Sequence, residues 1–181
     1  DKTVNEKSAL TFTVAAADAD LPANTLTYSL DAGAPAGASL DPATGVFTWT
    51  PTEAQGPGTN LITVRVTEDG TPSLSDSKSI TVVVNEVNET PVLAALANKT
   101  IAEGAALSLT AMATDADLPA NTLAFSLASA PPGASIDPAT GGFTWMPSGA
   151  QAPSTNVITV RVTDSGTPLL SATKSFTVLV T

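Results

Sequence analysis

Apolar and polar residues alternate along several short stretches of the chain, and glycine- and proline-containing turns separate these stretches. Leucine, phenylalanine and valine alternate with threonine in residues 10–14, and the same period of two occurs in residues 26–30, 47–49, 62–67 and 80–84. Successive side chains of a β-strand point to opposite faces, so the pattern is typical of strands with one buried face. Two sheets that face each other would bury both apolar sets, which predicts a β-sandwich.

The alternating pattern occurs twice because the chain contains an internal duplication. Residues 18–26 return as residues 115–123, an offset of 97 residues (18 to 115), and residues 41–45 return as residues 137–141, an offset of 96 (41 to 137). A repeat of this length is the size of one sandwich domain. We therefore predict two domains, residues 1–86 and 87–181, joined by a linker at about residues 85–91.

Each copy is expected to form a seven-strand antiparallel Greek-key β-sandwich, which makes the predicted fold class all-β. The second copy has Pro91–Leu96 ahead of its Glu103, whereas the first copy has almost nothing ahead of the matching Glu6. The first domain is therefore expected to lack part of its first strand, and the chain to be an excerpt from a longer protein.

Charge and composition exclude several classes of partner. The net charge is −10, from 7 Lys and Arg against 17 Asp and Glu, and the chain has neither histidine nor cysteine. This charge repels nucleic-acid phosphates and anionic lipid surfaces, so neither is an expected partner. No stretch approaches the roughly 20 apolar residues of a membrane span, so no membrane insertion is expected. Metal cations and basic surfaces remain.

The same motifs follow one another in both copies: an early glutamate, Asp-Ala-Asp after the second strand, Asp-Pro-Ala-Thr-Gly in mid-domain, and Val-Arg-Val-Thr with an acidic residue after it. With the acidic linker that ends in Pro91, this order resembles the cadherin repeat, and more closely the bacterial cadherin-like or dystroglycan-type, immunoglobulin-like relatives. The Phe-Thr-Trp-x-Pro stretches at 47–51 and 143–147 are similar to those relatives. The resemblance covers nearly all of both copies and implies tandem extracellular sandwiches that calcium rigidifies at their junctions.

The resemblance also implies a set of calcium ligands at the junction of the two domains. Asparagines stand where the family often has carboxylates, and Val87 and Glu89 would offer carbonyl oxygens, so one or two calcium ions are expected in place of three. The ligand positions carried over are Glu6 and Glu53 from the first domain, Asn85, Val87, Asn88 and Glu89 from the linker, and Asp115, Asp117, the carbonyl of Asn121 and Asp164 from the second domain.

The donor chemistry of these residues agrees with calcium, which takes 6–8 oxygen ligands and tolerates mixed carboxylates, amides and carbonyls. Zinc, copper and iron favour histidine or cysteine. The alternative for the aspartates is that they cap turns through hydrogen bonds to the backbone. We assign Asp41 and Asp137 to such turns. The outer half-sites are expected to be incomplete, because Asp18, Asp20, Asn24 and Glu68 lack a preceding linker and Gly149 stands where Glu103 would need a partner.

The expected function is that of a calcium-binding structural spacer or adhesion segment of a larger extracellular or cell-surface protein, bacterial by resemblance. Its partners would be neighbouring repeats, with another surface protein or a polysaccharide as further possibilities. The alternative is a carbohydrate-binding module, but Trp49, Trp145, Tyr28 and Phe125 lie in phase with apolar strand faces, which favours core packing. Paired carboxylates can hydrolyse glycosides, yet both copies carry the same pairs without a cleft-forming insertion, so no enzyme activity is expected.

Overall fold

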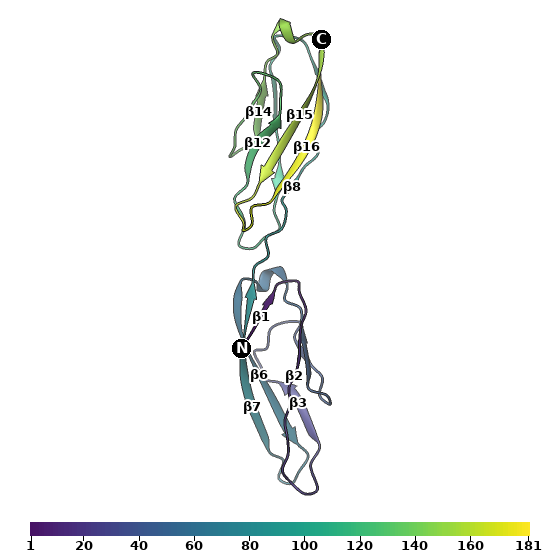
Figure 1. The fold of residues 1–181 in the computed structure, drawn as a ribbon, viewed down its shortest axis with the longest axis vertical. Helices are drawn as coiled ribbons and strands as arrows, with labels where there is room; N and C mark the ends of the chain where they lie inside the picture. The colour runs from purple at the N-terminus through teal and green to yellow at the C-terminus, as the bar shows by residue number, and fades with distance from the viewer. The chain divides into compact units, whose positions relative to one another are not determined.

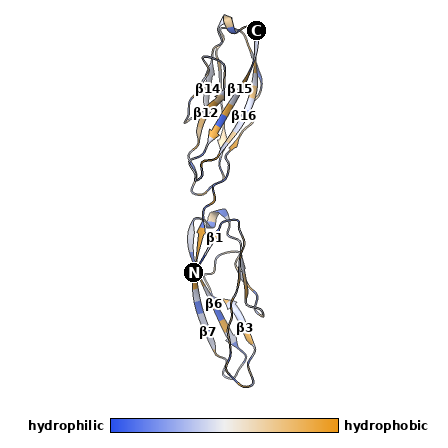
Figure 2. Cartoon of the chain, viewed as in Figure 1, coloured by the Kyte–Doolittle hydropathy of each residue, from blue (hydrophilic) through white to orange (hydrophobic).

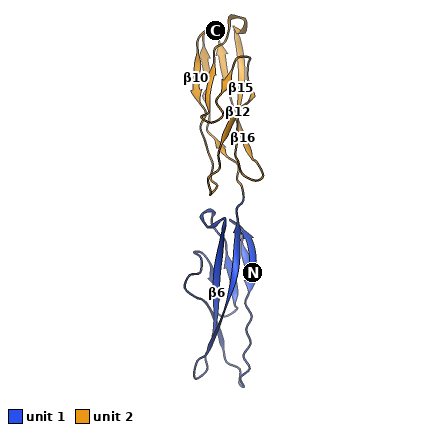
Figure 3. Cartoon of the chain, turned by 90° about the vertical axis from the view of Figure 1, so that its left-hand side faces the viewer, with its two compact units in different colours: residues 1–87 blue, residues 88–181 orange.

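The chain forms two compact units, residues 1–87 and residues 88–181 (Figure 3). This computed structural model describes residues 1–181. The division falls after Val87, one residue later than the predicted boundary. Each unit consists of strands joined by turns and loops, which confirms the all-β prediction (Figure 1).

Unit 1 is a sandwich of two sheets that contain seven strands. One sheet has the order β1-β7-β6-β3 and the other the order β2-β5-β4. All pairs are antiparallel except β1 with β7, which is parallel and departs from the purely antiparallel prediction. The strands are β1 (Lys2–Asn5), β2 (Leu10–Thr13), β3 (Leu26–Leu30), β4 (Ser39–Leu40), β5 (Val46–Trp49), β6 (Gly58–Glu68) and β7 (Ser75–Asn85).

Unit 2 repeats this arrangement and adds two short strands. Its sheets have the orders β12-β15-β16-β9 and β10-β14-β13, and β11 pairs with β8 in a separate two-stranded sheet. As β1 does in unit 1, β9 pairs in parallel with the last strand, β16. The strands are β8 (Val92–Leu93), β9 (Lys99–Ile101), β10 (Leu107–Thr110), β11 (Ala113–Thr114), β12 (Ala124–Ser129), β13 (Ser135–Ile136), β14 (Gly142–Trp145), β15 (Ser154–Thr163) and β16 (Ser171–Val180).

β8 has no counterpart in unit 1, which agrees with the prediction that the first copy lacks part of its first strand. The difference affects the core. Leu93 of β8 belongs to the buried cluster of unit 2, and Val162 of β15 is fully buried there, whereas the corresponding Val66 of unit 1 is only half-buried.

The cores lie between the sheets, where the alternation along the strands predicts them. Apolar and polar residues follow one another along β6 and β15 (Figure 2). The four aromatic residues that could have formed sugar platforms are buried, and each tryptophan donates its indole N–H to a backbone oxygen 3.2 Å away, from Trp49 to Ala36 and from Trp145 to Pro132. Core packing is therefore confirmed for these rings.

Two three-residue 3₁₀ turns, η1 (Glu53–Gln55) and η2 (Gly149–Gln151), are the helical segments of the chain. Neither has the length or the apolar composition that a membrane-crossing helix requires. Both follow the tryptophan strand of their unit, and the first residue of each turn, Glu53 or Gly149, lies near the early glutamate of its unit, Glu6 or Glu103.

The Asp-Pro-Ala-Thr-Gly turns have the capping chemistry that the sequence predicts. Asp137 Oδ1 accepts hydrogen bonds from the N–H groups of Ala139 and Thr140, at 3.0 and 2.7 Å, and from the Thr140 hydroxyl. These donors, chiefly the Thr140 N–H, hold the pKa of Asp137 below its ordinary value. The turn closes at Gly141, which has a φ of +68°, a conformation that is unfavourable for residues with a Cβ atom.

Gly141→Ala is expected to destabilise unit 2 by at least about 2 kcal/mol, because alanine is strained at positive φ and its Cβ would collide with the carbonyl oxygen of Ala111. Gly104→Ala is the matched control, since Gly104 has a φ of +71° but open space around its Cβ position. Urea denaturation of both variants separates the collision from the conformational strain. Equal losses of stability in the two would show that the contact with Ala111 is harmless.

Candidate metal sites

Three groups of oxygen-bearing side chains lie at the ends of the sandwiches. In unit 1, Glu6, Glu53 and Glu86 form what we call the Glu6 cluster, and Asp18, Asp20 and Glu68 form the Asp18 cluster. Within each cluster, one carboxylate oxygen from each residue lies within 4.8 Å of the others. In unit 2, the Asp117 cluster consists of Asp115, Asp117, Asn121 and Asp164 together with the linker residues Asn88 and Glu89.

Strand pairing assembles the Glu6 cluster. Parallel pairing of β1 with β7 ends at Asn5 opposite Asn85, so the next residues, Glu6 and Glu86, emerge side by side. The Glu6 N–H donates to the Asn85 carbonyl oxygen at 3.0 Å, which fixes this register. The Lys7 N–H donates to the Pro51 carbonyl oxygen at 2.7 Å and holds the loop that leads to Glu53, the first residue of η1.

The Glu6 carboxylate is buried, and one of its two oxygens has no hydrogen-bond donor. Its side chain is 2% exposed, Oε1 accepts the Val87 N–H at 3.1 Å, and Oε2 has no hydrogen-bond partner. Burial, together with the neighbouring Glu53 carboxylate, raises the pKa of Glu6 above its ordinary value, although the Val87 N–H lowers it. Burial of a carboxylate oxygen that lacks a hydrogen-bond donor costs free energy of folding.

Positive charge near the Glu6 cluster comes from Lys7, whose Nζ lies 2.7 Å from Glu53 Oε2. One ammonium group faces three carboxylates, so the cluster keeps an excess of negative charge. Gly56 lines the same space, and a Cβ there would collide with Glu6 Oε2. Glycine at this position therefore leaves room for the carboxylate.

In the Asp117 cluster the linker itself supplies hydrogen bonds. The Glu89 N–H donates to both carboxylate oxygens of Asp117, at 3.0 and 3.1 Å. The Asn121 side-chain amide donates to Asp117 Oδ2 at 2.7 Å and to Asn88 Oδ1 at 2.8 Å, and Asn88 donates to the Pro168 carbonyl oxygen at 2.8 Å. Asp117 is 2% exposed, so the residues that follow Val87 cover it.

Asp164 completes the Asp117 cluster from the end of β15. It is 4% exposed and accepts the N–H groups of Gly166 and Leu170 at 3.0 and 3.1 Å. Burial raises the pKa of Asp164, but the Leu170 N–H, the Asn88 side chain and the Gly166 N–H outweigh it and leave the pKa lowered.

The third acid of this cluster, Asp115, keeps one oxygen without a donor. Asp115 Oδ1 accepts the Asp117 N–H at 3.0 Å, whereas Oδ2 has no hydrogen-bond partner. Close by, Gly166 leaves the space that Asn88 occupies, because a Cβ at this glycine would collide with the Asn88 side chain. The cluster therefore combines satisfied carboxylates with one buried oxygen that lacks a partner.

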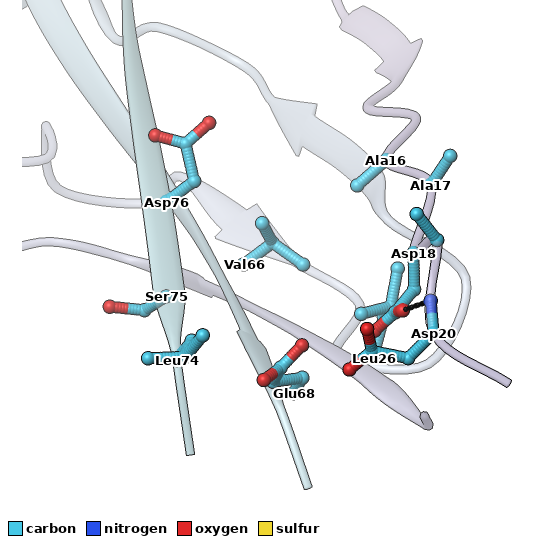
Figure 4. Close-up of a pocket in the computed structure, with 11 residues that line it drawn as sticks. Ala16, Ala17, Asp18, Asp20, Leu26, Val66, Glu68, Leu74, Ser75 and Asp76 are labelled. Carbon is cyan, nitrogen blue, oxygen red and sulfur yellow. Dashed lines mark hydrogen bonds between the residues drawn. The ribbon is translucent and has the colours of Figure 1, made fainter. Parts of the chain in front are cut away.

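The Asp18 cluster is the unit 1 counterpart of the Asp117 cluster, and it is more open. Asp18 Oδ1 accepts the Asp20 N–H at 2.6 Å, and the Asn24 amide donates to Asp20 Oδ2 at 3.2 Å. Ala16–Asp20 line one side of the adjoining cavity, Leu74–Asp76 line the other, and Val66 and Glu68 lie between them (Figure 4). Asp20 is exposed, whereas the corresponding Asp117 of unit 2 is 2% exposed.

The structure brings together most of the residues that the sequence singled out, within each unit. Glu6 lies beside Glu53, and Asp117 accepts hydrogen bonds from Glu89 and from Asn121, whose amide also donates to Asn88. Asn85 and Val87 contact this region through the backbone: the Asn85 carbonyl accepts the Glu6 N–H, the Val87 N–H donates to Glu6, and the Asn85 side chain turns to Asn5 Oδ1 at 3.3 Å.

Sequence reasoning left Glu86 out of the ligand set, although its carboxylate lies in the Glu6 cluster. The signal was the period of two, because Val82, Val84 and Glu86 fall on the same face of β7 and its extension. In unit 2 the position equivalent to Glu53 is Gly149, so Glu103 has no acidic partner there, as the sequence predicts. A Cβ at Gly149 would lie 3.2 Å from Glu103 Oε2, so the position of Glu53 is conserved in space but carries no carboxylate.

A family model described as "Putative Ig domain" matches residues 1–85 and again residues 90–181. The chain belongs to this family. Its two copies correspond to the two structural units, and the immunoglobulin-like resemblance is confirmed.

Among curated proteins, this tandem Ig-domain chain is similar to Protocadherin Fat 1 of Homo sapiens, with 39% identity over 117 residues, which is 60% of the chain. The match covers 3% of that relative, so the chain corresponds to a small part of it.

Solved structures of cadherin domains share the fold of the tandem Ig-domain chain. Mouse Cadherin-23 EC22-24 has a TM-score of 0.65 at 21% identity, over 99% of this chain and 62% of that one. Human Protocadherin-24 EC1-2 has a TM-score of 0.58 at 18% identity, over 90% and 85% of the two chains. The extracellular cadherin domains 3–6 of Protocadherin Gamma B2 give 0.57 at 21% identity, over 99% and 49%.

Because the pKa of Glu6 is raised in the folded state, folded protein binds this proton more tightly than unfolded protein does. In the presence of a chelator, the stability of unit 1 is expected to fall as pH rises from about 4.3 through the raised pKa. Glu6→Gln should flatten this part of the stability profile, and Glu103→Gln, at the equivalent exposed position of unit 2, should leave it unchanged. Urea titrations between pH 4 and 8 measure the profiles, and identical slopes for wild type and Glu6→Gln would contradict the assignment.

Proposed function

We propose that the chain is a calcium-binding tandem module that serves as a structural spacer or adhesion segment of a larger extracellular protein. Calcium ions bound by the Glu6 and Asp117 clusters would restrict the linker, residues 85–91, and so set the rigidity of the tandem. The role is structural and not catalytic. The observation that carries the proposal is the convergence of Glu6, Glu53 and Glu86 with a buried, partnerless Oε2 on Glu6.

The donor set suits calcium. Glu6, Glu53 and Glu86 offer carboxylate oxygens alone, and a hard cation with a flexible coordination shell matches such a set. A bound cation would remove the repulsion among the three carboxylates and supply the partner that Glu6 Oε2 lacks. Ion binding would therefore lower the free-energy cost of burying these carboxylates.

The Asp117 cluster supports the same function by a different arrangement. Asp117 accepts hydrogen bonds from the Glu89 N–H and the Asn121 amide, and Asp164 accepts them from the Gly166 and Leu170 N–H groups, so both carboxylates have partners without a cation. The buried Asp115 Oδ2, which has no hydrogen-bond partner, adds a free acceptor beside them. Such a preorganised set of oxygens can accept an ion without a large rearrangement.

The two clusters lie at consecutive positions of the chain. Glu86 is the last acid of the Glu6 cluster, and Asn88 is the first residue of the Asp117 cluster, with Val87 between them. Ions that hold both clusters would therefore immobilise the backbone on each side of Val87. The extracellular location is proposed from the likeness to the extracellular cadherin domains of Protocadherin Gamma B2 and the partial similarity to Protocadherin Fat 1.

The carbohydrate-binding alternative finds no specific support in the structure. Trp49 and Trp145 are 2% exposed, and Tyr28 and Phe125 are buried, so these rings cannot stack on a sugar. We therefore carry the spacer function forward alone.

Calcium at 1 mM is expected to stabilise the chain by about 1.4 kcal/mol per site if the dissociation constant is about 0.1 mM. Glu86→Gln and Asp117→Asn should each reduce the calcium-dependent rise in melting temperature. The matched control is Glu103→Gln, because Glu103 faces Gly149 and has no second carboxylate. Calorimetry with and without calcium measures the shift, and a shift that survives both test variants would argue against these clusters.

Calcium should also change the conformational spread of the tandem in solution. Small-angle X-ray scattering in 1 mM calcium is expected to give a narrower distribution of maximum dimensions than scattering in chelator, because bound ions restrict the linker. Glu86→Gln should reduce the difference, because it alters one of the two clusters. Superimposable profiles of wild type in the two buffers would mean that the linker does not respond to calcium.

A further inference from the structure

Lys7 is the one residue other than glycine with a positive φ, +57°, a conformation that is unfavourable for residues with a Cβ atom. By the 97-residue offset it corresponds to Gly104 of unit 2, whose φ is +71°. The backbones are held alike, since the Lys7 N–H donates to the Pro51 carbonyl oxygen at 2.7 Å and the Gly104 N–H donates to the Pro147 carbonyl oxygen at 2.8 Å. Glycine would therefore suit this turn in unit 1, so the reason for a lysine lies in its side chain.

The Lys7 side chain pairs with an acid that unit 2 also lacks. Its Nζ lies 2.7 Å from Glu53 Oε2, and Gly149 stands at the position of Glu53 in unit 2. Unit 1 thus carries a lysine and a glutamate where unit 2 carries two glycines. The Lys7 side chain is 45% exposed and the Glu53 side chain 17%, so the ammonium group reaches solvent while the carboxylate is mostly buried.

The ammonium group stabilises the Glu6 cluster as a bound cation would, but only in part. Glu53, which it contacts, also has an oxygen within 4.8 Å of those of Glu6 and Glu86. The Lys7 charge opposes the rise that burial causes in the pKa of Glu6. Yet this pKa stays raised and Glu6 Oε2 has no hydrogen-bond partner, so one ammonium group does not fully compensate the three acids.

A calcium ion that binds Glu53 would come close to this ammonium group, and the two positive charges would repel each other. The ion must therefore displace the lysine from the carboxylate or bind against its charge. Displacement is possible because the four-carbon side chain is flexible and already partly exposed. In either case the free energy of the ion pair is subtracted from the free energy of calcium binding.

We propose that Lys7 is an internal counter-ion that competes with calcium for Glu53 and so sets the calcium affinity of the Glu6 cluster. The inference rests on the proposed function, calcium binding by this cluster. Lys7 offsets the repulsion among the three acids at low calcium and leaves Glu53 when calcium is plentiful. At the Asp117 cluster, backbone and amide N–H groups, which carry no net charge, donate to Asp117.

A calcium titration of the full chain, followed by NMR of two glycine amides, measures the two clusters separately. Gly56 reports on the Glu6 cluster, because a Cβ there would collide with Glu6 Oε2. Gly166 reports on the Asp117 cluster, because its N–H donates to Asp164. Lys7→Gln is expected to lower the calcium dissociation constant at Gly56 at least about fivefold and to leave the one at Gly166 unchanged.

Two further variants separate charge from conformation. Lys7→Gly copies the residue of unit 2 and removes the strain at positive φ, and it should tighten calcium binding at Gly56 as Lys7→Gln does. The matched control is Lys78→Gln, which removes the same charge from β7 eight residues before Glu86 and should leave both dissociation constants unchanged.

Melting with and without calcium distinguishes competition from an ordinary ion pair. In chelator, Lys7→Gln should lower the melting temperature of unit 1 by roughly 3 °C, because the three acids lose their counter-ion. In saturating calcium the difference should disappear, because the ion has replaced the lysine.

Equal dissociation constants at Gly56 in wild type and Lys7→Gln, or an equal loss of melting temperature in the two buffers, would overturn the competition but leave calcium binding by the Glu6 cluster in place. A Gly56 amide that responds to calcium in neither wild type nor the Lys7 variants would overturn the proposed function of this cluster and the inference with it. A response in the Lys7 variants alone would support the inference and show that lysine excludes calcium from the wild-type cluster.

Discussion

The long hairpin of β6 and β7, repeated as β15 and β16, is the pairing on which the rest of each unit depends. Its register, from Gly58 opposite Val84 to Thr67 opposite Ser75, directs one set of side chains into the core and fixes where both strands end. β6 ends at Glu68 and β7 ends one residue before Glu86. One hairpin therefore places an acid of the Asp18 cluster at one end of unit 1 and an acid of the Glu6 cluster at the other.

Carboxylates that gather where strands end repel one another and lose hydration, and the two clusters offset this cost in different ways. At the Asp117 cluster, backbone N–H groups and asparagine amides stabilise the ionised form, so the pKa of Asp164 is lowered. At the Glu6 cluster the carboxylates face one another, and the pKa of Glu6 is raised. The first arrangement takes most of its hydrogen-bond donors from unit 2 itself, without a cation. The second gains most from one, which makes the Glu6 cluster the more sensitive of the two to its ionic surroundings.

Much of this organisation could be predicted from the sequence, because alternation and duplication are local and repeated signals. The apolar sets of residues 62–66 and 80–84 predicted the core, and Asp-Pro-Ala-Thr-Gly predicted its turn, since each depends on neighbouring residues alone. The parallel pairing of β1 with β7 could not be predicted from the sequence, because it joins residues 2–5 to residues 82–85, which lie far along the chain.

The missed interactions have the same long-range origin. Glu86 joins Glu6 through that parallel pairing, and the ligand set expected from the sequence left it out. Arg65 makes a two-pronged ion pair with Asp31, with both contacts at 2.8 Å, and this pair also depends on a long-range contact, the β3–β6 register. The sequence likewise could not show which carboxylates lie together, because tertiary packing determines it.

Gly149 shows how easily such a domain end can be changed. The position carries glutamate in unit 1 and glycine in unit 2, yet η1 and η2 have the same length, the same kind of capping box and the same place after the tryptophan strand. A surface replacement can thus delete one acid of a trio while the fold persists. Duplicated domains of this kind can therefore diverge in the acidic residues at their ends while every core residue is kept.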